Sequence, residues 1–173
     1  MRQRIRAALV DLALVLGWVA VVSAVVVTLA LSGAGPRLPP LQLNLVVGAA
    51  MVLPAIGWLT LTEGGRYGAS PGKQWLGLRV LRTDGDGLGR PRALVRNLAK
   101  LGLPWAIGHA AVVALLTTPA PAGADVWILL GIAVLLPVAY LVAAFLEGGR
   151  TPYDLLASSR VVTAATGRRV AED

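Results

Sequence analysis

Four long apolar stretches divide this chain, and none of them contains Asp, Glu, Lys or Arg. They cover Leu12–Leu31, Leu43–Thr62, Leu101–Thr118 and Val126–Leu146. Each is long enough for a helix across the hydrocarbon core of a bilayer, which takes about 20 residues. None alternates apolar and polar residues as a membrane β-barrel does. The pattern therefore predicts an all-α membrane protein with four transmembrane helices in two hairpins.

The composition agrees with a lipid environment. The 173 residues are 56% hydrophobic and 14% charged, with a mean hydropathy of +0.71. An ordinary soluble domain has about a quarter of its residues charged, so that class is excluded. The lack of cysteine excludes a disulfide framework and thiol chemistry.

Basic residues are distributed unevenly around the four stretches. Of 16 Lys and Arg residues, all but Arg37 precede the first stretch, lie between the second and third, or follow the fourth. Loops rich in Lys and Arg remain on the cytoplasmic side of a membrane. We therefore expect a multi-pass plasma-membrane protein whose termini and central loop, residues 63–100, are cytoplasmic. The same basic surface is expected to bind the anionic lipid headgroups of the bilayer.

The letters EGGR occur twice, at residues 63–66 and 147–150, each time directly after an apolar stretch. Paired glycines let a chain leave a helix through left-handed conformations and turn sharply. Each copy continues with a hydroxyl residue and a Pro, which favour a helix start, and then with a short β-prone segment. The matched positions are Ser70-Pro71 with Thr151-Pro152, and Arg79 with Arg160.

These matches predict a single domain, residues 1–173, built from parallel repeats of about 7–92 and 93–170. Each repeat would hold a helical hairpin, a short cytoplasmic interfacial helix and minor β-hairpin segments. At the second position after the Pro, the first copy has Lys73 and the second has Asp154. We expect packing about a pseudo-twofold axis to bring these opposite charges together as an ion pair.

Four segments carry a family resemblance: "RAALVDLAL", "GASPGKQWLGLRVLRTDGDG", "RALVRNLAKL" and "GGRTPYDLLASSRVV". Together they resemble the RDD family of bacterial integral membrane proteins, named for one Arg and two Asp. The resemblance places these three at Arg6, Asp11 and Asp154. It implies a transport-related role in the bacterial plasma membrane, with sodium/proton exchange proposed for some members. Many members have His before the last Asp, where this chain has Tyr153.

Asp11 lies about five residues into the first helix, roughly 7 Å beyond Arg6 at about 1.5 Å per residue. A lone carboxylate inside a bilayer is costly, so it requires a partner or a proton. We favour a structural ion pair with Arg6 or with one of three further arginines, and the alternative is a cation or proton site. The three arginines are Arg79, Arg92 and Arg96.

Two further groups are candidate sites. Glu63 and Glu147 are each followed, three residues later, by Arg66 and Arg150. We expect the Glu and Arg of each copy to form an ion pair across the EGGR turn. The alternative is a cation site shared by the two Glu residues, with the arginines as gates. His109 is the single histidine, and we expect it to bind a neighbouring helix, with a proton relay as the alternative.

Two kinds of function fit these features. A transport-related role for a small ion or solute needs a polar path, which an oligomer could build, and the family resemblance favours it slightly. A non-catalytic accessory subunit of a larger membrane complex, or a lipid-organising protein, needs only apolar faces and a basic surface. With no Cys, one His and no close carboxylate pair within a span, we expect no enzyme, cofactor or metal site. We also expect no nucleic-acid partner.

Overall fold

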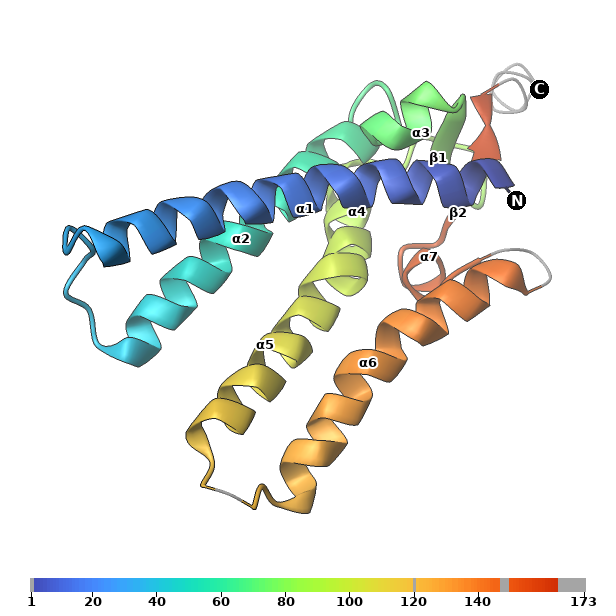
Figure 1. Cartoon of the computed structure of the whole chain (residues 1–173). Coiled ribbons are helices and arrows are strands. Elements are labelled where there is room, and N and C mark those ends of the chain that lie inside the picture. Colours follow the sequence, from blue (N-terminus) through green and yellow to red (C-terminus); the bar gives the residue numbers. More distant parts are fainter. Residues whose placement is uncertain (1, 120, 147–149, 165–173) are drawn as a thin grey trace.

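Four long helices form the bulk of the described residues (Figure 1). The structure, a computed structural model, describes residues 2–119, 121–146 and 150–164. The first hairpin consists of α1 (Arg2–Leu31) and α2 (Pro40–Glu63); the second consists of α4 (Arg90–Asn97), η1 (Leu98–Gly102), α5 (Leu103–Thr117) and α6 (Ala124–Phe145). α4, η1 and α5 run as one continuous helix. With α1, α2 and α6 it makes four helices whose length and apolar composition are sufficient to cross a membrane. The predicted spans are confirmed as helices.

Two of the long helices begin well before the apolar stretches that predicted them. α1 begins at Arg2 and α4 begins at Arg90, so the residues preceding both stretches are helical. η1 is a single π-helical turn, in which the Leu103 amide donates to the Leu98 carbonyl. Such turns inside α-helices occur frequently at functional sites. The early start of α4 places Arg96 on a helix, and Asp11 lies on α1 as expected.

Short elements gather at one end of the long helices, and we call them the polar layer, residues 64–89 and 150–164. They are α3 (Pro71–Trp75), β1 (Leu78–Arg82), α7 (Pro152–Leu156) and β2 (Ser159–Thr163). A short helix thus begins at both predicted Pro residues. Ser70 and Thr151 have the extended backbone of an N-cap, and Thr151 forms a capping box with Asp154, whose carboxylate accepts a hydrogen bond from the Thr151 amide.

The two strands pair with each other, one from each predicted repeat. β1 and β2 are antiparallel, with Val80 directly opposite Val161. A single antiparallel bridge from Leu81 to Gly87 closes a short hairpin after β1. Strands of five residues are too short to be stable alone, whereas pairing across the chain buries Val80 and Val161 beside Ala7. The sheet therefore joins the two halves of the polar layer.

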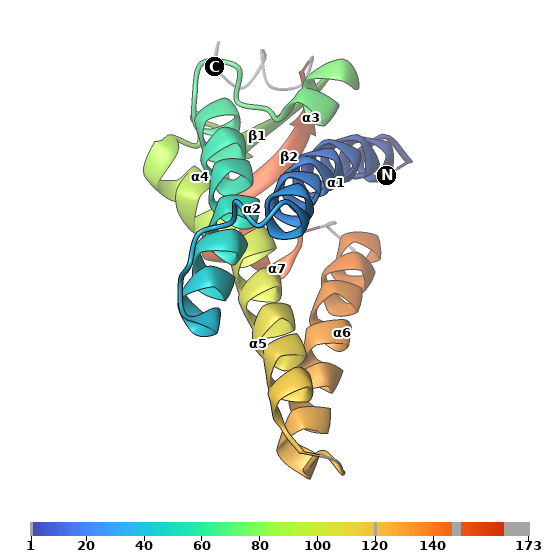
Figure 2. The same cartoon turned by 60° about the vertical axis from the view of Figure 1, so that its left-hand side comes forward.

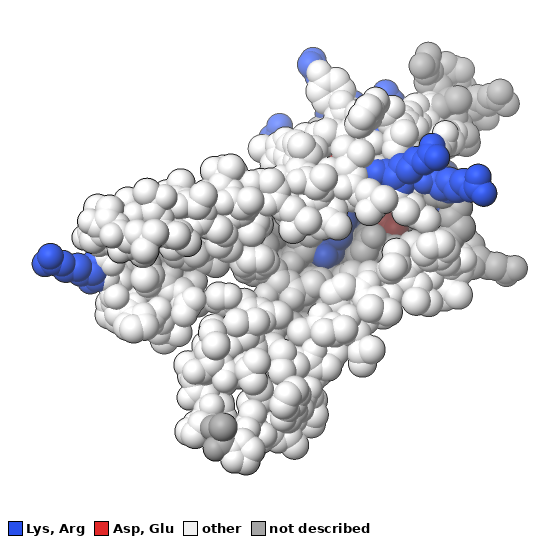
Figure 3. All heavy atoms as spheres, in the orientation of Figure 1, with Lys and Arg blue, Asp and Glu red and all other residues white. Residues whose placement is uncertain are grey.

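The two hairpins diverge as they leave the polar layer (Figures 1 and 2). α1 packs on α2 and α5 packs on α6, while α2 packs on α4 and η1 near the polar layer. The space-filling view shows a hollow between the hairpins (Figure 3). The molecule is thus held together mainly at its polar end.

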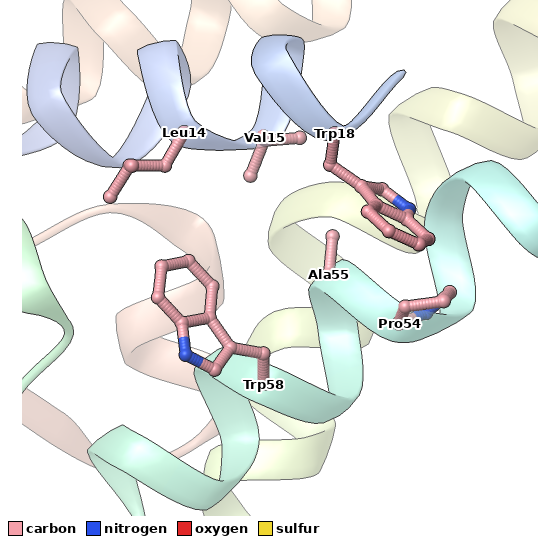
Figure 4. A pocket seen from close by; sticks show the side chains of 6 residues that line it. All are labelled: Leu14, Val15, Trp18, Pro54, Ala55 and Trp58. Carbon is pink, nitrogen blue, oxygen red and sulfur yellow. The ribbon is translucent and has the colours of Figure 1, made fainter. Parts of the chain in front are cut away.

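A gap also opens between α1 and α2, and Trp18 divides it by donating a hydrogen bond to the Ala50 carbonyl at 3.1 Å. On the side of the polar layer lies a pocket of about 250 Å³ (Figure 4), lined by Leu14, Val15, Trp18, Pro54, Ala55 and Trp58. On the other side lies a larger groove of about 600 Å³, lined by apolar residues such as Val22 and Val47. Both spaces are suited to hydrocarbon.

Candidate functional site

Five ionisable side chains from five helices meet where the long helices enter the polar layer, and we call them the charge network. The members of the charge network are Asp11 (α1), Glu63 (α2), Lys73 (α3), Arg96 (α4) and Asp154 (α7). The most exposed of these side chains, Lys73, is only 8% accessible. Buried charges persist in proteins when they are paired and hydrogen-bonded, so these pairings determine what the site can do.

Lys73 holds the first part of the network together. Its Nζ donates to Glu63 Oε1 at 2.7 Å and to Ser70 Oγ at 2.9 Å, and it lies 3.4 Å from Asp11 Oδ2. The three donors of an ammonium group are therefore filled by three oxygens. The same oxygen shell would also suit a small monovalent cation.

Asp11 binds the start of α3 as well as Lys73. Its Oδ2 accepts a hydrogen bond from the Ser70 hydroxyl at 2.5 Å, and its Oδ1 accepts one from the Gly72 amide at 2.9 Å. This approach depends on glycine, because a Cβ at Gly72 would overlap the carbonyl oxygen of Ala7 on α1. Asp11 therefore fixes α3 directly against α1.

Glu63 joins the two parts of the network. Its Oε1 accepts from Lys73, and its Oε2 accepts from Arg96 Nη1 at 2.6 Å and from Asn97 Nδ2 at 3.2 Å. The carboxylate thus lies between two buried cations. Replacing it with a neutral group would leave both cations short of negative charge.

Asp154 anchors α7 in the second part. Its Oδ1 accepts from Arg96 Nε at 2.9 Å, and its Oδ2 accepts from the Thr151 hydroxyl at 2.7 Å. The Tyr153 ring lies beside the guanidinium, 5.2 Å from Arg96 Cζ to the ring centroid. Burial alone would raise the pKa of the Asp154 carboxyl, but Arg96 and the Thr151 hydrogen bonds hold that pKa below its ordinary value of 3.8.

The expected pairing of Lys73 with Asp154 is wrong. Lys73 binds Asp11 and Glu63, whereas Asp154 binds Arg96. The reason is that α3 packs on α1 and α7 packs on α4, so each short helix finds its counter-charge on a long helix. The prediction that Asp11 takes part in an ion pair is confirmed, although its partner is Lys73.

The expected pairing of Glu63 with Arg66 is also wrong. Glu63 points into the charge network, while the Arg66 guanidinium binds the Tyr67 hydroxyl and lies over its ring. Glu147 lies outside the described residues, so its pairing with the exposed Arg150 remains a prediction.

Three other predicted arginines lie apart from the charge network. Arg6 is exposed on α1 and forms no ion pair with the residues that the structure describes. Arg79 and Arg160 lie on the paired strands, opposite Val162 and Leu81 respectively.

His109 lies on α5 and faces α2. Its ring is stacked with Trp105, with 6.2 Å between the ring centroids. A Cβ placed on Gly48 would be 3.5 Å from His109 Nε2, so the imidazole packs closely against α2 at this glycine. This position agrees with the expected helix-packing role, while the proton relay remains untested.

The sequence interpretation did not identify several members of this site. Arg96 was one of four possible partners for Asp11, and Ser70, Asn97 and Thr151 were not linked to the charges. A signal was present in "RALVRNLAK", where Arg96 and Asn97 follow the small Ala93 by three and four residues. That spacing places all three on one helix face, which here is buried.

Comparison with known proteins identifies the family. A family model described as the RDD family matches residues 1–158. No curated protein and no solved structure matches the chain. The match includes Arg6, Asp11 and Asp154, the three positions that the sequence motifs indicated. The chain therefore belongs to the RDD family.

Proposed function

We propose that this protein is a non-catalytic accessory protein of the bacterial plasma membrane, which organises lipids or a larger membrane complex around its apolar helices. The observation that supports this proposal is the closed charge network. Its three carboxylates, Asp11, Glu63 and Asp154, are all paired with Lys73 or Arg96. Such a network fixes the polar layer to the hairpins and leaves the diverging apolar faces for partners.

Purification from the native membrane in mild detergent tests this proposal. The mass of the particle and the proteins in it would be measured by light scattering and mass spectrometry. We expect a stoichiometric complex with a larger membrane protein, or a particle with retained lipid. A bare homo-oligomer that moves ions after reconstitution into liposomes would contradict the proposal.

A transport-related role is the second candidate, and the oxygen shell around Lys73 supports it. If Lys73 loses its proton, Asp11, Glu63 and Ser70 could hold a small cation in its place. Arg96 could not act in this way, because an arginine keeps its charge in proteins. Cation flux in liposomes, compared between the wild-type protein and Lys73→Arg, separates the two candidates, since the accessory role predicts no specific flux in either protein.

We also propose that the polar layer faces the cytoplasm, as the distribution of basic residues indicates. Ser70 is fully buried and unsuitable for labelling, but Thr83 and Ser32 are exposed at opposite ends of the molecule. In this cysteine-free chain, Ser32→Cys should react with an impermeant reagent from outside intact cells. Reaction of Thr83→Cys under the same conditions would show that the polar layer faces outward and would contradict the proposed orientation.

The two halves are proposed to be a parallel duplication. The strand register supports this, because the matched residues Val80 and Val161 lie opposite each other and Arg79 lies opposite Val162. A pairing that is symmetric about two matched residues is what a twofold axis at the sheet centre would produce. Alignment of related RDD proteins, searched for internal similarity at the same offset, tests this proposal.

A further inference from the structure

Lys100 has an ammonium group without a hydrogen-bond acceptor in the described part of the chain. It is half-buried on the π-helical turn η1, at the start of α5. Glu63 and Asp11 are near enough to attract it, and Lys73 and Arg96 are near enough to repel it. Their hydrogen bonds already join these four groups to one another and to their other neighbours. An ammonium group has three donors for oxygen acceptors, so a ligand that supplies such oxygens would be stabilised beside it.

The polar end of the molecule has more positive charge than its own acids can pair. The described carboxylates at this end are all in ion pairs, three in the charge network and two, Asp84 and Asp86, with Arg82. Exposed arginines remain without an acidic partner among the described residues: Arg2, Arg6, Arg79, Arg90, Arg92 and Arg150. The surplus favours an anionic partner.

The hollow between the two hairpins points to a lipid as that partner. Basic atoms lie inside the hollow between the hairpins, and basic side chains gather beside it at the N-terminal end of α1 (Figure 3). Away from the polar layer, both hairpins expose large apolar side chains such as Leu16 and Val134. A phospholipid supplies phosphate oxygens and hydrocarbon chains in one molecule. It therefore matches a basic region that is followed by the apolar faces of the hairpins.

We propose that the hollow between the two hairpins is a binding site for one anionic phospholipid, whose phosphate accepts hydrogen bonds from Lys100. Its acyl chains lie along the diverging hairpins and fill the space between them. The basic surplus around the hollow selects an anionic over a zwitterionic headgroup. This inference deepens the proposed function, because it names a lipid as a partner and assigns its site.

Lysine acylation tests the site in the unmodified protein. The chain has only two lysines, Lys73 and Lys100, and Lys73 is buried in ion pairs, so it serves as an internal reference. The protein would be placed in nanodiscs of phosphatidylglycerol or phosphatidylcholine and treated with an amine-acylating reagent, with the peptides followed by mass spectrometry. We expect Lys100 to be acylated more slowly in phosphatidylglycerol. Equal rates in the two lipids would overturn the proposal.

Native mass spectrometry of variants provides a second test. Wild-type protein, Lys100→Arg and the control Arg92→Gln should each retain one phosphatidylglycerol at high salt, whereas Lys100→Gln should lose it. Arg92 is exposed on the same continuous helix, two turns before Lys100, and so controls for the general loss of a surface charge. Retention by Lys100→Gln, or equal protection by glycerol phosphate without acyl chains, would contradict a lipid site at Lys100.

The outcomes also separate this site from the proposed function. If phosphatidylglycerol does not bind but the stoichiometric membrane complex remains intact, only the lipid site is refuted. If the lipid binds and the purified protein moves ions as a bare homo-oligomer, the lipid site stands and the accessory role is refuted.

Discussion

In the first half of the chain the short helix α3 carries the cation and α1 carries the carboxylate, whereas in the second half α4 carries the cation and α7 the carboxylate. The pairs are Lys73 with Asp11, and Arg96 with Asp154. Both short helices start with a hydroxyl residue and Pro, and both hydroxyls donate to the carboxylate of their own half. The same backbone arrangement is therefore held by charges of opposite sign.

The halves also differ in how closely the short helix approaches its long helix. In the first half, Gly72 allows α3 to lie against the α1 backbone, and Asp11 accepts directly from its amide. In the second half, Tyr153 occupies the equivalent position after the Pro. Its ring packs against the side chains of Arg96 and Tyr140. The first half depends on close backbone contact, and the second on side-chain packing.

Glu63 is the residue that both halves share, so its loss should have the largest effect. Glu63→Gln keeps the shape but leaves Lys73 and Arg96 buried with less negative charge. Breaking a buried pair costs about 3–5 kcal/mol, and we expect that loss in the free energy of unfolding, measured by denaturant titration in detergent. The control Asp84→Asn breaks an ion pair whose carboxylate is 48% exposed and should cost under about 1 kcal/mol. Equal small losses would show that Glu63 does not join the halves.

Gly72→Ala tests the close approach in the first half. The new Cβ would overlap the Ala7 carbonyl, which belongs to the α1 backbone and has little freedom to move. We expect a loss of about 1–3 kcal/mol in the same unfolding assay. Gly87→Ala adds a methyl group to open space and should stay within about 0.5 kcal/mol of the wild type. If both variants match the wild type, the contact between α1 and α3 is not tight.

The pH dependence of stability tests the second half. Because the folded pKa of Asp154 is lowered, its stabilising contribution is present above the ordinary value of 3.8 and is lost as the pH falls through the folded pKa. Wild-type protein should therefore lose stability more steeply below about pH 4 than Asp154→Asn, whose neutral side chain does not titrate. Thermal unfolding across an acid pH series measures the difference. Parallel curves would contradict the ion pair with Arg96.

Tyr153→Leu should give the smallest effect, because it removes no charge and takes away only a ring that lies beside Arg96 and Tyr140. A partly buried cation–π contact contributes about 0.5–2 kcal/mol, and we expect a loss in that range. The control Tyr67→Leu removes the ring beside Arg66, where Tyr67 is 49% exposed, and should cost less. A larger loss from the control would contradict the buried position of the Tyr153 contact.

Much of the fold could be predicted from the sequence, because lipid imposes strong rules on apolar stretches. The four spans and the Pro-initiated short helices followed from run length and from turn chemistry. The strand partners could not be predicted, since a five-residue strand pairs with whatever edge the tertiary fold brings near it. The direct pairing of Val80 with Val161 depends on the relative placement of the two halves.

The charge network was predictable only in kind. A carboxylate such as Asp11 on a membrane helix requires a counter-charge, and that requirement held. Its identity depends on helix packing: α3 lies on α1, so Lys73 meets Asp11 and not the equivalent Asp154. Glu63 was assigned to Arg66 by local spacing, but the chain turns at Gly64 and leaves Glu63 facing the interior.

The central claim is that the charge network is a structural clamp, and Asp11→Asn tests it most directly. The substitution keeps the shape of the side chain and removes the charge beside Lys73. The measurement pairs the melting temperature in detergent with cation flux in liposomes, at matched amounts of reconstituted protein. The clamp predicts a lower melting temperature and no specific change in flux relative to wild type. A variant that melts like the wild type, while a cation flux present in the wild type is abolished, would contradict the claim and assign the Lys73 oxygen shell to transport.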